Sequence, residues 1–189
     1  GSASYDLITA EPPPPIMAGV VHLYTSEYFQ LMRTRLAVGG IATYWLPVIN
    51  ISEATTKSLI ASFCAAFPDC SLWNGAGRNL MLMGTRDARG PVDDLRFSQQ
   101  WRTPAVRAEL VELGFELPAQ LGALFIGDAP YLRALTSDAL PLTDDQPARM
   151  QQPLNAPNGD ALLTTWCDAA AARERFRDSA MIAALLPAS

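Results

Sequence analysis

Carboxylates in two separate parts of the chain have the residue type and position that suit binding of a cationic ligand. Glu11 directly follows the short apolar segment 5–9 and precedes four consecutive prolines, 12–15. Proline fixes φ and has no backbone N–H, so this segment is expected to be extended and rigid. Asp144 and Asp145 are adjacent in a segment bounded by prolines. Each of these three carboxylates could hold an amine nitrogen or could simply lie in solvent.

Aromatic side chains offer a second means of holding an amine. Tyr24, Tyr44 and Trp45 could line a pocket by stacking or by cation–π contact. Tyr44 and Trp45 alternate on an expected strand, and core packing is the favoured interpretation of these two. His22 is the only histidine in the chain and is interpreted as a loop or capping residue. One histidine and three cysteines without a C-x-x-C pair do not make a zinc ligand set, so no metal is expected.

Charge and cysteine usage limit the partners and the compartment. The formal net charge is −5, with Lys57 as the only lysine, and no basic cluster is long enough to follow phosphates. We therefore expect no nucleic-acid partner. The longest uncharged stretch, 36–52, is interrupted by glycine and proline, so no membrane insertion by this chain is expected. Cys64, Cys70 and Cys167 are interpreted as reduced, buried thiols, which favours a cytoplasmic location.

The first 86 residues have the pattern of alternating strands and helices. We expect strands at 5–9 and 41–46, with a helix between them that Ser26 caps and Gly39-Gly40 ends. Ser52 is expected to cap a second helix with a buried stripe over 59–67. Segments 70–73 and 80–84 flank an Asn-Gly turn and predict an antiparallel hairpin. This order predicts an α/β fold with parallel strands and a hairpin at one edge.

Beyond residue 86 the pattern is helical and less regular. Thr103 followed by a proline predicts a helix through about Leu113, and two more helices are expected to begin at Pro118 and Pro130. A single long helix is expected from Asp160 to about residue 186. We therefore divide the chain into an α/β domain, 3–86, and a helical extension packed on it, 87–189.

Several of these segments, in the same order, resemble the spermidine synthase (polyamine aminopropyltransferase) family. The resemblance is greatest to a bacterial branch in which such a domain follows membrane helices. It covers about the first 85 residues and one later loop. The matching segments are 5–8, the Glu-Pro-rich loop after it, 23–29, 36–40, the Trp-Leu-Pro at 45–47 and the Thr-Asp-Asp-x-Pro at 143–147.

The resemblance implies a partial Rossmann-like S-adenosylmethionine-dependent methyltransferase fold. This chain would supply the carboxyl-terminal half of the sheet, with its terminal antiparallel hairpin, plus the helical extension. In the family, the segments that hold decarboxylated S-adenosylmethionine precede the strand that opens this sequence. We therefore expect no cofactor in this chain, and decarboxylated S-adenosylmethionine only in a full-length relative.

The resemblance also implies that transfer chemistry is lost here. The family's catalytic Asp falls on Pro14, which can neither accept a proton nor pair with a cation, so we predict no catalytic residue. The candidates for substrate binding are Glu11, Tyr24, Trp45, Asp144 and Asp145. The protein to which this chain belongs would transfer an aminopropyl group to a polyamine, this chain itself being inactive; the alternative is a non-enzymatic polyamine-sensing or scaffolding domain.

The implied half-sheet also predicts self-association. Its first strand would lack a neighbour, and an exposed strand edge pairs readily with another chain. We therefore expect a homodimer or a higher oligomer. A full-length relative would be attached to the membrane with this domain on the cytoplasmic side.

Overall fold

The computed structural model describes residues 3–15, 19–49, 51–75, 79–88, 90–145 and 160–185. Its strands form one mixed sheet, and its helices are short apart from α2. The elements are β1 (Tyr5–Ala10), η1 (Val20–Tyr24), α1 (Ser26–Arg35), β2 (Leu36–Leu46), α2 (Glu53–Ala66), β3 (Ser71–Asn74), β4 (Leu80–Thr85), α3 (Asp94–Arg102), α4 (Pro104–Glu112), η2 (Pro118–Leu124), β5 (Phe125–Gly127), α5 (Ala129–Leu135), α6 (Asp160–Trp166), α7 (Ala169–Asp178) and α8 (Ala180–Leu185).

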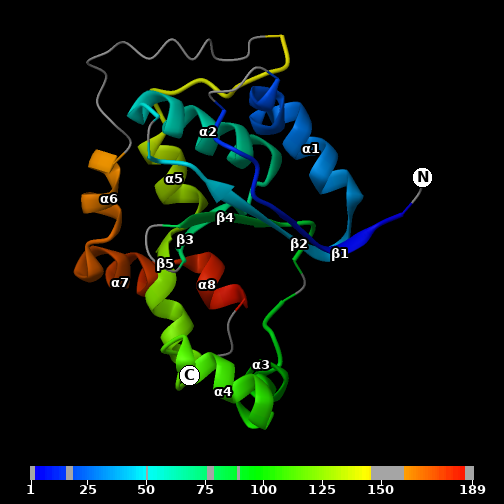
Figure 1. Cartoon of the computed structure of the whole chain (residues 1–189), viewed down its shortest axis with the longest axis vertical. Coiled ribbons are helices and arrows are strands. Elements are labelled where there is room, and N and C mark those ends of the chain that lie inside the picture. The colour runs from blue at the N-terminus through cyan, green and yellow to red at the C-terminus, as the bar shows by residue number, and fades with distance from the viewer. Residues whose placement is uncertain are drawn as a thin grey trace.

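The sheet is open and has the strand order β1-β2-β4-β3-β5. β1 and β2 are parallel and joined through α1, whereas β4 runs antiparallel to both β2 and β3. The β3–β4 hairpin therefore inserts its second strand against β2. This arrangement confirms the predicted α/β class and a partial Rossmann-like sheet with an antiparallel hairpin, but the hairpin lies between β2 and β5 and does not form the edge of the sheet that was expected for it. Figure 1 shows β1 at one edge of the sheet and α1, α2 and α5 grouped on one side of it.

Strand alternation separates a buried face of the sheet from a half-exposed one. On β2 the side chains of Ala42, Tyr44 and Leu46 point toward the helices and are at most 1% exposed. They pack against Leu59 and Phe63 of α2 in one continuous core. Period-2 alternation on strands and the apolar stripe on α2 explain why these residues meet. The core thus lies between the sheet and the α1–α2 layer.

Both ends of α1 differ from the prediction. Thr25 is the N-cap of α1, and Ser26 is its first helical residue. The helix ends at Arg35, and β2 begins at the next residue, so Gly39 lies inside a strand. Gly39 has φ 82°, and the β1–β2 register shifts beside it, so its left-handed conformation makes a bulge and does not end the helix.

The carboxyl-terminal part differs in two ways. The single helix expected from Asp160 is three helices, because polar side chains restart the helical hydrogen bonding twice. Asp168 accepts from Ala171 N at 2.7 Å, and Ser179 Oγ accepts from Ile182 N at 3.2 Å. In addition, β5 joins the sheet beside β3. Three apolar residues give too short a pattern to predict a strand.

The cysteines correct an interpretation made from the sequence. Cys64 and Cys70 form a disulfide with a Cα–Cα distance of 5.2 Å, and Cys167 is free and exposed. The interpretation of three reduced, buried thiols is therefore wrong. A separation of six residues gave no motif, but the turn after α2 brings the two side chains together. Among the described residues, no helix is long and apolar enough to cross a membrane.

Candidate functional site

The proline loop after β1 is held in place by Tyr24 of η1. The Tyr24 hydroxyl donates to the carbonyl oxygens of Pro12, at 3.2 Å, and Pro13, at 3.1 Å. Its ring is 1% exposed and meets Tyr44 edge to face, with 5.5 Å between centroids. The Tyr44 hydroxyl in turn donates to the carbonyl of Leu23. Prolines have no backbone N–H, so the carbonyl oxygens of this loop need a donor from another element. The buried Tyr24 hydroxyl supplies that donor and so anchors the loop.

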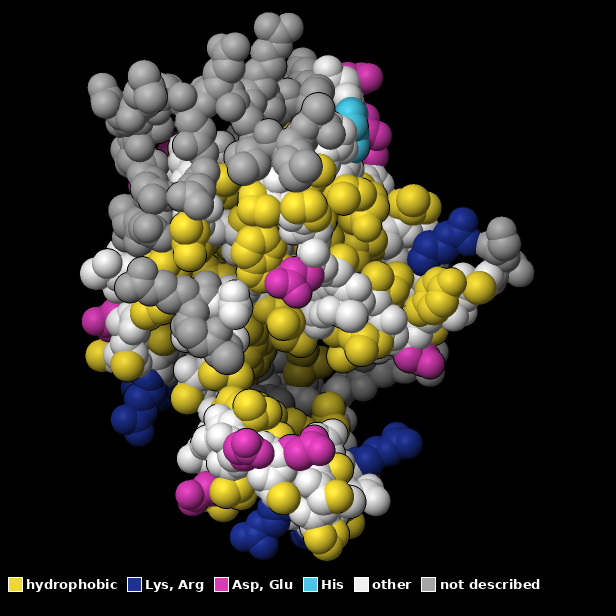
Figure 2. Space-filling model, viewed as in Figure 1, with side chains coloured by type: hydrophobic (Ala, Val, Ile, Leu, Met, Phe, Trp, Pro, Cys, Tyr) yellow, Lys and Arg dark blue, Asp and Glu magenta, His cyan; other side chains and the backbone are white. Residues whose placement is uncertain are grey.

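The loop that carries Asp144 and Asp145 reaches the same end of the sheet through Thr25. We call this region, together with Glu11, His22 and Glu27, the acidic edge. The Thr25 hydroxyl lies 2.8 Å from Asp144 Oδ1 and donates to it, although 119 residues separate them. His22 Nδ1 lies 3.5 Å from the same carboxylate oxygen. The backbone N–H of Asp144 donates to Glu27 Oε2 at 3.2 Å. Figure 2 shows the chain's single histidine, in cyan, next to acidic side chains at the top of the molecule.

Leu142 anchors this loop to the core and to two helices. Its side chain is buried in the core, and its N–H donates to Ser62 Oγ of α2 at 2.7 Å. Its carbonyl accepts from the N–H of Ser26 at 2.9 Å. The loop is therefore attached to both α1 and α2, and its two aspartates follow a buried anchor.

The acidic edge combines exposed carboxylates with buried tyrosine hydroxyls that carry no charge. Glu11, Glu27, Asp144 and Asp145 are exposed. Burial raises the pKa of Tyr24, and burial together with the nearby Tyr24 and Tyr28 raises the pKa of Tyr44. Both phenols therefore stay neutral at ordinary pH. The edge offers a cationic ligand several carboxylates and one imidazole.

The candidates predicted from the sequence divide into two groups. Asp144 joins the edge formed by η1 and α1, and Glu11 lies immediately before the prolines that Tyr24 holds. Tyr24 itself is in the core, which leaves its ring no exposed face for a ligand. Trp45 lies on the sheet face opposite Tyr44 and pairs with Met81 of β4. Asp145 is exposed beside Asp144.

Sequence reasoning missed three residues of this edge. Thr25 caps α1 by accepting from Tyr28 N at 3.4 Å, and a Thr-Ser-Glu sequence before an apolar helix is a capping signal that could have found it. Glu27 is an acid in the first turn of α1, and that position alone does not predict that it accepts from Asp144 N. His22 meets an aspartate 122 positions later, and no local pattern predicts such a pairing. Within the described ranges, no group of three or more His, Cys, Asp or Glu side chains could hold a metal ion.

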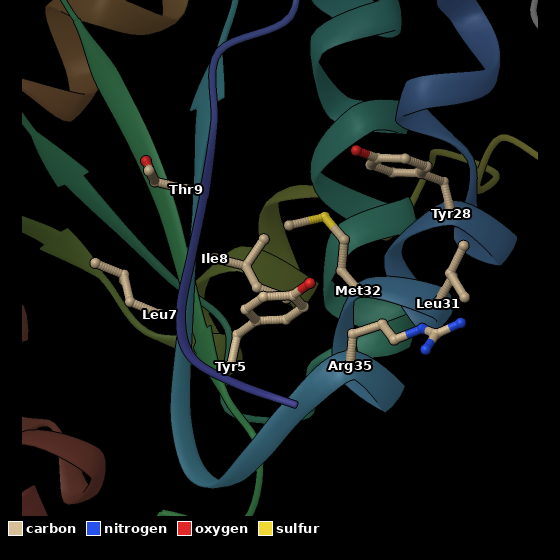
Figure 3. A pocket seen from close by; sticks show the side chains of 8 residues that line it. All are labelled: Tyr5, Leu7, Ile8, Thr9, Tyr28, Leu31, Met32 and Arg35. Carbon is tan, nitrogen blue, oxygen red and sulfur yellow. The ribbon is translucent and has the colours of Figure 1, made fainter. Parts of the chain in front are cut away.

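A shallow groove lies apart from this acidic edge, between β1 and α1. It has a volume of about 470 Å³, and Tyr5 and Ile8 of β1 face Tyr28, Leu31 and Met32 of α1 across it. Figure 3 shows these side chains pointing toward one another beside the open edge of β1. A second cavity of about 820 Å³ lies between α5 and the α7–α8 pair.

The backbone of the chain resembles that of solved structures. One of them is the crystal structure of a probable spermidine synthase from Corynebacterium glutamicum ATCC 13032, with a TM-score of 0.45 and 21% sequence identity. The similarity covers 80% of this chain and 51% of that one, so the chain spans about half the length of the structure it matches. No protein-family model and no curated protein matches the sequence.

Proposed function

We propose that this chain is the acceptor-side half of a spermidine-synthase-like protein and that it binds a polyamine at the acidic edge. The observation that supports the proposal is the docking of the Asp144 loop onto η1 and α1. The Asp144 carboxylate contacts Thr25 and His22, which lie on either side in sequence of Tyr24, the residue whose hydroxyl holds the loop after β1. Open α/β sheets bind ligands at the carboxyl ends of their parallel strands, and this edge is of that kind.

The proposed binding chemistry is charge pairing without catalysis. A polyamine carries several ammonium groups, and exposed carboxylates such as Asp144, Asp145 and Glu27 attract them by charge-assisted hydrogen bonds. The proposed transfer of an aminopropyl group from decarboxylated S-adenosylmethionine belongs to a longer protein, since the donor-binding segments of the family precede Tyr5. Pro14 supplies no base for the attacking amine. The chain alone therefore binds without turnover.

A second function is favoured by Pro14. A longer protein with proline at the catalytic position keeps the amine site and loses the proton acceptor. That combination is what a polyamine-sensing or scaffolding domain requires. Titration of the longer protein with donor and acceptor separates the two functions: formation of an aminopropylated product supports the enzyme, and amine binding without product supports the sensor.

Calorimetric titration of the 189-residue chain with spermidine and with putrescine tests the proposed site. We expect binding that weakens as salt is added, because the attraction is between exposed charges. Replacing both acids of the loop (Asp144→Asn with Asp145→Asn) should weaken binding several-fold, given that an ion pair between exposed groups contributes roughly 0.2–1 kcal/mol. Glu109→Gln with Glu112→Gln, which removes two exposed acids of α4, is the matched control and should leave binding unchanged.

Two results would contradict the amine site. Absence of heat at millimolar spermidine would remove the proposal altogether. Equal weakening by the loop variant and by the double variant Glu109→Gln with Glu112→Gln would mean that the amine responds to net charge and has no defined site.

We also propose that two copies of the chain associate through the open edge of β1. β1 is at one end of the strand order, and Leu7 of β1 and Leu31 of α1, which are 59% and 53% exposed, lie on either side of this strand. A second β1, antiparallel about a twofold axis, would bury this edge in each copy. Light scattering across a dilution series should report a dimer. Leu7→Lys should give a monomer, whereas Leu113→Lys in the extension should not. A wild-type monomer at every concentration would refute the dimer.

A further inference from the structure

The disulfide lies at the connection between the helical layer and the sheet. Cys64 is in the last turn of α2 and Cys70 immediately precedes β3, and their side chains are 6% and 0% exposed. Four residues make the turn between the end of α2 at Ala66 and the start of β3 at Ser71, and they are Phe67, Pro68, Asp69 and Cys70 itself. A covalent bond across this turn fixes the direction in which β3 leaves α2.

Three other contacts converge on the same turn. Asp69 accepts from the backbone N–H of Thr85 on β4 at 3.1 Å, and the Thr85 hydroxyl also donates to it. Arg133 of α5 donates to the carbonyl of Pro68 at 2.8 Å. Phe67 packs so closely against Gly84 that a Cβ there would lie 2.6 Å from its ring. The turn therefore joins α2, β3, β4 and α5 at one point.

From this placement we infer that the domain is completed by oxidation and works in an oxidising compartment. The reaction is a transfer of two electrons: the two thiols lose two protons and two electrons as the S–S bond forms, and a disulfide-class oxidant is reduced to two thiols. Disulfides persist in secreted, periplasmic and other extracytoplasmic proteins, whereas glutathione and thioredoxin keep cytosolic thiols reduced. A buried pair at the centre of the fold is a structural bond, unlike an exposed regulatory one.

This inference replaces the cytoplasmic location expected from the sequence. If a longer protein carries membrane helices, the domain lies on the non-cytoplasmic side. The inference is independent of the polyamine site, because it rests on Cys64, Cys70 and the contacts of Pro68 and Asp69, whereas the proposed site rests on the contacts of Asp144. Loss of amine binding and loss of the disulfide are therefore separate outcomes.

Thiol counting on the wild-type chain tests the bond directly. Protein made in the bacterial periplasm is trapped with a maleimide under denaturing conditions, before and after reduction, and weighed by intact mass. We expect one label before reduction, on Cys167, and three afterwards. Cys167→Ser is the matched variant and should change these numbers to none and two. Three labels on unreduced periplasmic protein would overturn the inference.

Thermal unfolding tests whether oxidation completes the fold. Cytosolic protein is compared before and after equilibration with a glutathione buffer of extracytoplasmic poise. We expect oxidation to raise the melting temperature by roughly 5 °C, from the loop-closure effect of a short cross-link in a chain of this size. An unchanged melting temperature in fully oxidised protein would overturn the structural role. Failure of that buffer to oxidise the pair would overturn the assigned compartment.

Discussion

The sheet half of the molecule, by which we mean residues 5–85, contains a helix that is packed very differently from helices α4 and α7, which come after it. Seven residues of α2 are buried, half of a fourteen-residue helix. In contrast, α4 and α7 bury none of their residues, although they are nine and ten residues long. Hydrophobic burial is the main stabilising contribution in folding, so the two parts cannot contribute equally. The difference indicates that α2 contributes far more to the core than α4 and α7 do, although β5, α5 and α6 of the later part also bury residues in that core.

The means of attachment also differ. The sheet half is organised by one aromatic cluster, in which Phe63 lies 5.1 Å from Phe29 and 4.6 Å from Phe67 between ring centroids. α7 is attached by Arg175, which donates to the Ile126 carbonyl and stacks over Tyr131, 4.5 Å from the ring centroid, and by Phe176, whose ring lies 5.6 Å from that of Phe125. A cluster of buried rings is lost only with the whole core, whereas a helix held by a few partly exposed side chains can open locally.

Truncation of a core ring should give the largest contrast between the two parts. Phe63→Ala removes a fully buried ring and should lower the free energy of unfolding by about 3–5 kcal/mol. Leu113→Ala, at a side chain that is 67% exposed after α4, should change it by less than about 0.5 kcal/mol. Urea denaturation followed by circular dichroism measures both. Comparable losses would mean that the extension is packed as tightly as the sheet half.

Local chemistry was enough to predict much of the sheet half. Ser52 precedes an apolar stripe, and in the structure it caps α2 by accepting from Thr55 N at 3.1 Å. Alternation and an Asn-Gly turn predicted the hairpin that forms β3 and β4. Pro104 likewise marks the first turn of α4. In each case the deciding residues lie within a few positions of one another, so propensity and periodicity suffice.

The candidate site depends on contacts that sequence spacing does not contain. Asp144 was selected from a two-residue motif, but its partners Thr25 and His22 stand more than a hundred positions earlier. The Cys64–Cys70 bond needed the geometry of a turn, and β5 needed the exposed edge of β3. The Gly39 bulge was interpreted as a helix end, because a left-handed glycine serves both purposes.

Alkaline pH should lower the free energy of unfolding through two tyrosines of the sheet half, and this is the largest effect that we expect after Phe63→Ala. Burial raises the pKa of Tyr24 and Tyr44 above the value of about 10 that tyrosine has in an unfolded chain. Their contribution to stability is therefore complete below pH 10 and declines as the pH rises further. Each buried phenol should remove about 1.4 kcal/mol from the free energy of unfolding per pH unit above 10.

Urea midpoints at pH 9, 10 and 11 measure this decline. Tyr44→Phe removes one of the two phenols, so it should halve the slope while lowering stability at pH 9 through loss of its bond to the Leu23 carbonyl. The Cys167→Ser background prevents thiol exchange at high pH. A slope that Tyr44→Phe leaves unchanged would assign the alkaline transition to other groups.

Two glycines give the finest test of the difference between the parts, because they impose the same strain in each. Gly39 in β2 has φ 82°, Gly114 after α4 has φ 88°, and an added Cβ would meet nothing within 4 Å at either position. Alanine at each therefore costs only backbone strain, about 1–2 kcal/mol.

If α4 opens independently of the sheet, Gly39→Ala should lower the global free energy of unfolding by that amount and Gly114→Ala by less than half of it. Hydrogen exchange should then show the missing part of the Gly114→Ala effect as roughly tenfold faster exchange confined to the α4 amides, since 1.4 kcal/mol is a factor of ten. Equal global losses would show that α4 unfolds only together with the sheet, and the two parts would then form a single cooperative unit despite their unequal burial.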